Sequence, residues 1–195
     1  MSHGGRKYDP AHRAHLDSDE RRAYLNPDAI LGAFGIGPGM HVADIGAGTG
    51  FFALPAAIRV GPHGRIYAID MAPEMLADLR ANVARAKAVS VEIAQSTEDE
   101  IPLPDASVDF ALLACVLHEL EGPGTLYECR RILRPKGRLG VVEWRKIDQD
   151  IGPPREHRLS EAEATAVLVR AGFAAVRTFE AGPYHYGIEA RIGKA

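Results

Sequence analysis

Cysteine is scarce in this sequence: Cys115 and Cys129 are the only two among 195 residues, and they lie fourteen positions apart. Neither belongs to a C-x-x-C pair, so no pattern for a disulfide framework or a zinc site exists. No run of about 18 apolar residues occurs either, and we therefore expect no transmembrane helix and no membrane partner. Because the first residues lack the apolar segment of a signal peptide, a cytoplasmic location is the default expectation.

A strong charge of one sign is also missing. The formal net charge is −3, which does not favour nucleic acid as a partner. The eight histidines are scattered; His3, His12 and His15 lie in a polar leader where metal binding would be incidental, so no metal site is predicted. Apolar residues make up 46% of the chain, which is enough for the core of one globular domain.

What the sequence does contain is a regular alternation of strand and helix patterns. Strands are predicted near residues 40–45, 65–70, 89–94, 108–114, 138–144, 173–180 and 184–192. Helices are predicted near 27–35, 50–60, 73–87, 122–133 and 160–171, with residues 134–137 as a turn. Such alternation predicts an α/β fold, a doubly wound and mostly parallel seven-stranded sheet with helices on both faces. The last two strands are separated by Gly182-Pro183, so we expect an antiparallel hairpin that adds an antiparallel edge strand.

The domain organisation expected from this pattern is simple. Residues 1–26 are polar and charged and form an N-terminal leader or cap segment. Residues 27–195 form a single domain that starts at the helix after Asn26-Pro27, with asparagine as N-cap and proline at the first helical position.

Residues 42–52, Val-Ala-Asp-Ile-Gly-Ala-Gly-Thr-Gly-Phe-Phe, are the most informative stretch. A buried strand ends in a turn made of Gly46, Ala47, Gly48, Thr49 and Gly50, and a helix follows. Glycines allow sharp bends and the close approach of a ligand. Asp44 precedes the turn and places a carboxylate at the carboxyl end of the strand, where open α/β sheets bind ligands. The spacing does not fit the dinucleotide fingerprint, because Phe51 falls on its third glycine, and no P-loop lysine follows. A purely structural turn remains an alternative.

Asp70 adds a second signal one unit later. It ends the second strand, twenty residues after Gly50, where an acid hydrogen-bonds ribose hydroxyls in nucleotide-binding α/β folds. It also suits the N-cap of the helix that begins near residue 73, and the two roles are compatible. Met71 beside it is suited either to a purine face or to the core.

These residues resemble the motifs of a known family. Val-Ala-Asp-Ile-Gly-Ala-Gly-Thr-Gly (42–50) resembles motif I of class I S-adenosylmethionine-dependent methyltransferases, and Ile-Tyr-Ala-Ile-Asp-Met-Ala-Pro-Glu-Met-Leu (66–76) resembles their second motif. Residues 101–113, 116–120 and 133–139 resemble the later strand signatures in the same order. The resemblance covers about residues 40–145. It is strongest to the small type 11 enzymes, similar to those of ubiquinone and menaquinone biosynthesis, and it implies a Rossmann-like fold.

The resemblance implies S-adenosylmethionine as the cofactor and methyl transfer to a small-molecule acceptor as the reaction. Glycines 46, 48 and 50 would approach its methionine moiety, Asp44 its amino group, Asp70 its ribose hydroxyls and Met71 its adenine. Ser96, Thr97 and Glu98 occupy the position of the family's contact with the adenine amino group, although this chain departs from the usual Gly-Asp-Ala there. A solvated loop is the alternative for them. Ala114 would line the sulfonium end.

Two residues are predicted to have catalytic roles. His118 follows the fourth strand and is suited to act as a general base, and Glu143 ends the fifth strand; ordinary packing roles are the alternatives for both. Cys115 lies near the expected methyl path, although a small core residue is the more ordinary interpretation. Ala114-Cys-Val-Leu117 replaces the tetrapeptide of nucleic-acid amino-nitrogen methylators, and the cysteine set of arsenic methylators is missing.

Two short segments are expected to cover the acceptor pocket. They are residues 1–30, with Tyr8, His12, Arg21, Arg22 and Tyr24, and residues 145–159, with Arg155, His157 and Arg158. Their shortness favours a small acceptor or a site completed in a homodimer. The alternative functions are a non-catalytic or nucleotide-sensing binding protein and an NAD-type oxidoreductase.

Overall fold

The computed structural model describes residues 18–193. The leader residues His3, Tyr8, His12 and His15 therefore lie outside the described residues. Within this range no helix is long and apolar enough to cross a membrane. No cluster of three or more histidine, cysteine, aspartate or glutamate side chains suited to a metal ion occurs in the same range.

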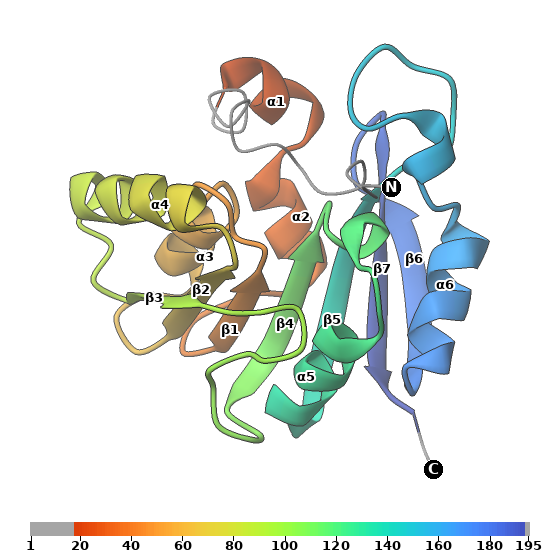
Figure 1. Ribbon diagram of the computed structural model, residues 1–195. Helices are drawn as coiled ribbons and strands as arrows, with labels where there is room; N and C mark the ends of the chain where they lie inside the picture. The colour runs from red at the N-terminus through yellow and green to blue at the C-terminus, as the bar shows by residue number, and fades with distance from the viewer. Residues whose placement is uncertain (1–17, 194–195) are drawn as a thin grey trace.

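Figure 1 shows a single sheet whose strand order is β3-β2-β1-β4-β5-β7-β6. The strands are β1 (His41–Ile45), β2 (Arg65–Asp70), β3 (Val91–Gln95), β4 (Val108–Ala114), β5 (Leu133–Trp144), β6 (Phe173–Glu180) and β7 (His185–Ile192). Strands β1 to β5 pair in parallel, whereas β7 is antiparallel to both β5 and β6. The predicted Rossmann-like, mostly parallel seven-stranded sheet with a C-terminal antiparallel hairpin is confirmed.

Three α-helices of the described range, the first two and the last, begin at a side-chain cap. The helices of this range are α1 (Asp19–Tyr24), α2 (Pro27–Ala33), α3 (Ala53–Val60), α4 (Pro73–Ala86), α5 (Gly124–Ile132) and α6 (Glu161–Arg170), with short 3-10 turns η2 (Leu117–Glu119) and η3 (Arg155–His157). The side chains of Ser18 and Asn26 accept hydrogen bonds from the backbone N–H groups of Arg21 and Ala29. Ser160 and Glu163 form the predicted capping box at the start of α6, which satisfies two otherwise unpaired N–H groups.

Helices cover both faces of the sheet, and alternate strand residues build two cores. Val42 and Leu112 pack with α2, α3 and α4 in one buried cluster. Their neighbours Ala43 and Leu113 pack with α5 and α6 in the other. This alternation follows from the two-residue period of a strand, and it explains why β4 is apolar almost throughout.

The topology places three predicted site residues at one edge of the sheet. Strand β1 pairs with β2 on one side and β4 on the other, so the chain reverses its direction of travel across the sheet at β1. Ile45 lies level with Ile69 of β2 and with Leu113 of β4. The next residue of each strand, namely Gly46, Asp70 and Ala114, therefore reaches the same edge. A topological switch point of this kind is where open α/β sheets bind ligands.

The hairpin joins the sheet through its second strand. The antiparallel strand is β7, which lies between β5 and β6, while β6 forms the edge and runs parallel to β5. The sequence pattern predicted the hairpin but did not indicate which of its two strands would pair with β5. The burial of the two strands reflects this order: β7 is buried over most of its length, whereas β6 is mostly exposed.

Three element boundaries also differ from the expectation. The predicted turn at 134–137 is a bulge inside β5, because Val108 pairs with Leu133 and Phe110 already pairs with Arg138. Helix α3 begins at Ala53 instead of residue 50, because Gly50 has a φ of +99°, which is not helical. Strand β3 begins at Val91, because Lys87 ends α4 in the left-handed region and Val89 is 89% exposed in the turn.

Candidate functional site

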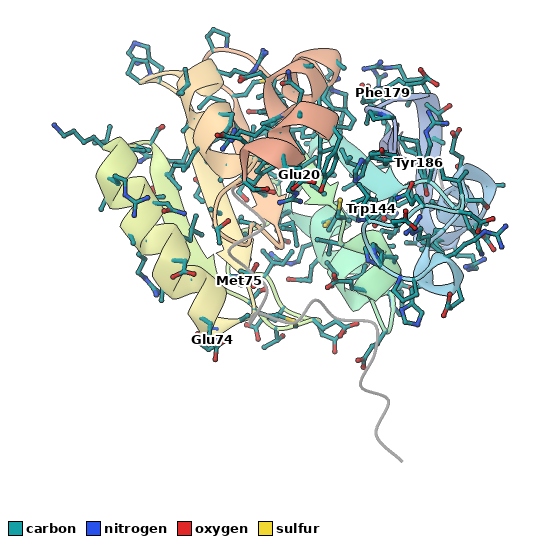
Figure 2. All side chains as sticks on the ribbon, turned by 90° about the horizontal axis from the view of Figure 1, so that it is seen from above. Glu20, Glu74, Met75, Trp144, Phe179 and Tyr186 are labelled. Carbon is teal, nitrogen blue, oxygen red and sulfur yellow. The ribbon has the colours of Figure 1, made fainter. Side chains whose placement is uncertain are left out.

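A cavity of about 740 Å³ opens at the switch point, within the range of about 300–1,000 Å³ that is typical of small-molecule sites. Figure 1 shows α1 and the segment after β5 above this end of the sheet. In Figure 2, which looks down on it, Met75 of α4 lies to one side and Trp144 of β5 to the other, and both line the cavity.

Most of the predicted site residues line this one cavity. They are Asp44, Gly46, Ala47, Gly48, Thr49, Asp70, Met71, Ser96, Thr97, Glu98, Ala114 and His118. The two predicted residues that do not line it, Gly50 and Glu143, lie directly behind it. Gly50 packs against Leu54 and Leu79, and Glu143 is fully buried beneath His118.

The glycine turn has a backbone that side chains would obstruct. Gly46, Gly48 and Gly50 have φ values of +71°, +55° and +99°, a region that favours glycine. A Cβ on Gly46 would come within 2.5 Å of Val116 Cγ2. The N–H groups of Gly46 and Ala47 both donate to the Ile69 carbonyl, at 2.8 and 2.9 Å. The turn is thus held against β2 while its other side faces the cavity.

Asp70 joins the turn to the start of α4. Its Oδ2 accepts a hydrogen bond from Gly48 N–H at 2.8 Å, and its Oδ1 accepts one from Ala72 N–H at 2.9 Å. The residue at the N-cap of α4 is Ala72, and α4 has no side-chain cap, so the N-cap role considered for Asp70 is wrong: Asp70 bonds the N–H of the N-cap residue itself. Each carboxylate oxygen has a second acceptor site, and Asp70 lines the cavity.

Asp44 carries a buried carboxylate that is only half satisfied. The side chain is 3% exposed, and a hydrogen bond from Ala53 N–H lies at the start of α3. Its Oδ2 has no partner among the described residues. Burial, and secondly the neighbouring charge of Asp70, raise the pKa of Asp44 from 3.8 to about 7. A buried acceptor without a partner is costly, so this oxygen is suited to a cationic or hydrogen-donating ligand.

The far side of the cavity, next to β2 and β3, is partly apolar. Met71 is 39% exposed there, beside the buried residues Met75 and Ile101. Glu98 is already engaged: its Oε1 accepts from the N–H groups of Glu121 and Gly122 at 2.6 and 3.1 Å. This leaves Ser96 and Thr97 as the better-placed polar groups of the 96–98 segment.

His118 and Glu143 form a buried pair at the opposite side. His118 Nδ1 lies 2.9 Å from both carboxylate oxygens of Glu143. Glu143 also accepts hydrogen bonds from the backbone N–H groups of His118 and Trp144, at 3.2 and 3.0 Å. This network fixes the imidazole, and in a neutral ring it holds the proton on Nδ1, so Nε2 carries the lone pair. Glu119 Oε1 lies 3.8 Å from Nε2.

Cys115 lines the cavity, and its thiol is held in the protonated form. It has a φ of +60°, and burial, with a second contribution from Glu143, raises the pKa of its thiol to about 12. The thiol therefore stays protonated at neutral pH, in agreement with the interpretation of a small packing residue.

Both segments expected to cover the pocket reach it. Arg21 and Tyr24 of α1 line the cavity, as do Gly152, Pro153, Pro154 and His157. The second segment is fastened by Arg158, which is 2% exposed and donates to the carbonyls of Pro153, Ile147 and Ile151 at 2.7, 2.9 and 2.8 Å. The hydrogen bonds of Arg158 thus hold the segment after β5 in place over the cavity.

Several lining residues carried no sequence signal for the site. Phe51 and Phe52 directly follow the glycine turn, and that position alone could have indicated them. Met75, Ile101 and Thr125 come from three different segments, and only the fold brings them together.

The comparisons with known proteins agree with this geometry. Residues 43–141 match the family model described as a methyltransferase domain. Over 95% of this chain and 100% of the other, the fold superposes on a protein from Aquifex aeolicus described as a SAM dependent methyltransferase, with 37% identity and a TM-score of 0.92. A protein from Sulfolobus solfataricus described as a type 11 methyltransferase shares 26% identity, with a TM-score of 0.73 over 88% of this chain and 95% of its own.

The chain belongs to the methyltransferase domain family, because the family model covers half of it and the Aquifex aeolicus protein matches over its full length. Among curated relatives, an arsenite methyltransferase of Halobacterium salinarum is 35% identical over 119 residues, 60% of this chain and 30% of its own length. An uncharacterized methyltransferase of Mycobacterium tuberculosis is 40% identical over 117 residues, 60% of this chain and 44% of its own. The match thus spans less than half of the length of these relatives.

Proposed function

We propose that this protein transfers a methyl group from S-adenosylmethionine to a small-molecule acceptor. The observation that carries the proposal is the pairing of two carboxylates with one glycine turn. The buried Asp44 with its unpartnered oxygen and Asp70 with its spare acceptor sites line the same cavity. They suit a ligand that has an ammonium group near one end and vicinal hydroxyls further along.

The residues fit this cofactor on chemical grounds. Asp44 would accept from the amino group, Asp70 from the ribose hydroxyls, and Met71 and Met75 would contact the adenine. Ser96 and Thr97 are the candidates for its polar edge. Gly46 and Gly48 would let the backbone approach the methionine part, and Ala114 would leave room beside the sulfur. The cofactor supplies an activated methyl group on a sulfonium leaving group.

The remaining chemistry is alignment, exclusion of water and removal of a proton. His118 Nε2 is the candidate base, and Glu143 is the residue that orients it and stabilises the imidazolium formed. The acceptor therefore carries a protonated oxygen, nitrogen or sulfur near Nε2. Tyr24, Val116 and residues of the 152–157 segment line the cavity as well, and the short cover that they form supports a small acceptor.

Arsenic is poorly suited as an acceptor here, although one relative is named an arsenite methyltransferase. Arsenic(III) is a soft centre and prefers several thiolate ligands. Among the described residues the cavity contains one thiol, that of Cys115, while Cys129 is fully buried in the core.

Calorimetry with S-adenosylhomocysteine, the demethylated cofactor, tests the proposal. We expect binding with a Kd in the micromolar range, because several charged hydrogen bonds and an adenine site are available. Absence of binding at millimolar ligand would overturn the assignment. Binding of NADH instead would support the alternative of an NAD-type oxidoreductase.

Asp70→Ala should weaken S-adenosylhomocysteine binding by at least about tenfold. The variant removes hydrogen bonds to the ligand, each worth about 1.5–3 kcal/mol when one partner is charged, and also loosens Gly48. Glu74→Ala is the matched control, because Glu74 lies three residues away from the cavity's Met71 on the exposed first turn of α4 (Figure 2). If the two variants bound S-adenosylhomocysteine with equal affinity, Asp70 would not contact this ligand.

A further inference from the structure

A second charged group faces the same end of the cavity as Asp44. Arg21 of α1 lines the cavity, and its guanidinium carbon lies 4.2 Å from the centroid of the Phe51 ring. Phe51 directly follows Gly50, so this contact places the arginine over the glycine turn. Burial raises the pKa values of both Asp44 and Cys115, and the positive charge of Arg21 offsets a small part of each rise, as expected of a neighbour of both groups.

The position of Arg21 is determined by packing and not by chance. Leu25, at the end of α1, is fully buried in the core. Tyr24 lies 6.2 Å from Trp144 and 5.9 Å from His185, ring centroid to ring centroid, and it is stacked on the latter. These anchors fix the short helix, and from it the side chain of Arg21 reaches Phe51 and the cavity.

From this geometry we infer that Arg21 binds the carboxylate of the cofactor's amino-acid end. This inference rests on the proposed function and adds a binding residue to it. An α-amino acid group is a zwitterion, and the cavity presents a matching pair: the acceptor oxygen of Asp44 for the ammonium and the guanidinium of Arg21 for the carboxylate. A guanidinium is suited to a carboxylate because it donates two parallel hydrogen bonds.

The pair also has an electrostatic rationale. Asp44 and Asp70 lie close enough to raise the pKa of Asp44, and the ligand carboxylate would add a third negative charge at the same place. Without a cation this charge would be repelled. The positive charge of Arg21 would balance the ligand carboxylate, and the ligand ammonium would balance Asp44. Neither end of the zwitterion would then be buried without a partner. It also follows that the predicted cap segment, residues 1–26, takes part in cofactor binding through α1.

The test is a ligand-by-variant comparison in the full chain by calorimetry. The ligands are S-adenosylhomocysteine and its decarboxylated analogue, which lacks only the carboxylate. Arg21→Gln should lose about 10- to 100-fold in affinity for S-adenosylhomocysteine, the effect of one hydrogen-bonded charged group. Its affinity for the decarboxylated analogue should stay within about twofold of the wild type, which also shows that the cavity is intact. Arg21→Lys should recover part of the loss.

Arg22→Gln is the matched control. Arg22 is the next residue of α1 and also lies against Phe51, at 4.9 Å, but it is exposed and does not line the cavity. We expect both ligands to bind this variant as they bind the wild type. If Arg21→Gln lost affinity equally for the two ligands, Arg21 would only shape the cavity and the inference would be overturned. An unchanged affinity for both ligands would overturn it as well. A wild type that binds neither ligand would instead overturn the proposed function.

Discussion

Asp44→Asn should weaken cofactor binding and at the same time stabilise the free protein. The free protein keeps a carboxylate that burial and Asp70 disfavour in its charged form, so that the pKa of Asp44 is about 7. The unfolded chain releases this proton near pH 3.8, while the folded chain holds it up to about pH 7. Between these two pH values the free energy of unfolding falls as pH rises, because the unfolded chain binds fewer protons than the folded one. Above about pH 7 this loss of stability stays constant.

The size of this effect follows from the pKa difference. Relative to Asp44→Asn, the wild type should lose about 2–3 kcal/mol in the free energy of unfolding between pH 5 and pH 8, at about 1.36 kcal/mol for each unit of the pKa difference that is crossed. Urea unfolding of both proteins at the two pH values measures it. Asp150→Asn, which changes an exposed acid outside the cavity, should show no such difference.

The same titration should control binding. An ammonium group pairs with the ionised carboxylate, so wild-type affinity for S-adenosylhomocysteine should rise by up to about tenfold per pH unit from pH 5 to 7 and then level off. Asp44→Asn should bind at least about tenfold more weakly at pH 8 and lack this slope. If the variant binds as tightly as the wild type at pH 8, Asp44 does not contact the ammonium.

His118→Gln should lower the rate of methyl transfer by about 10²- to 10⁴-fold, the usual contribution of a general base. Its affinity for S-adenosylhomocysteine should change by less than about twofold, because the base acts on the acceptor. Glu143→Gln should lower the rate as well, since the neutral amide no longer stabilises an imidazolium and donates where a lone-pair acceptor is required. The measurement is transfer of labelled methyl to an acceptor found by screening small molecules with the wild type.

A surface histidine provides the control for this pair. His63 is exposed in the turn between α3 and β2, and His63→Gln should retain the full rate. A His118→Gln variant that keeps more than half of the wild-type rate would show that the acceptor needs no base. In that case alignment alone would account for the reaction, and the buried pair would serve to hold the end of β4 against β5.

The fold, and the meeting of most candidate site residues in one cavity, were predictable from sequence because both depend on local patterns. Strand and helix periods determine the alternation of elements, and parallel strands bring their carboxyl ends to one edge. Gly46 and Asp70 follow two neighbouring strands, so their meeting is a consequence of topology. The boundaries near Gly50 and Val89 were less predictable, because they depend on single backbone angles within turns.

The sequence by itself determined the class of fold, the glycine turn and the acid that ends the second strand, since each is written in neighbouring residues. Only the tertiary structure decided which groups at the site remain to be satisfied. Three such features depend on contacts between residues far apart in the sequence. Asp44 keeps an oxygen without a partner, Glu98 accepts hydrogen bonds from the backbone at 121–122, and Arg21 reaches the glycine turn from α1. Burial and contacts between distant segments set the energies of charged groups, and no local pattern in the sequence predicts them.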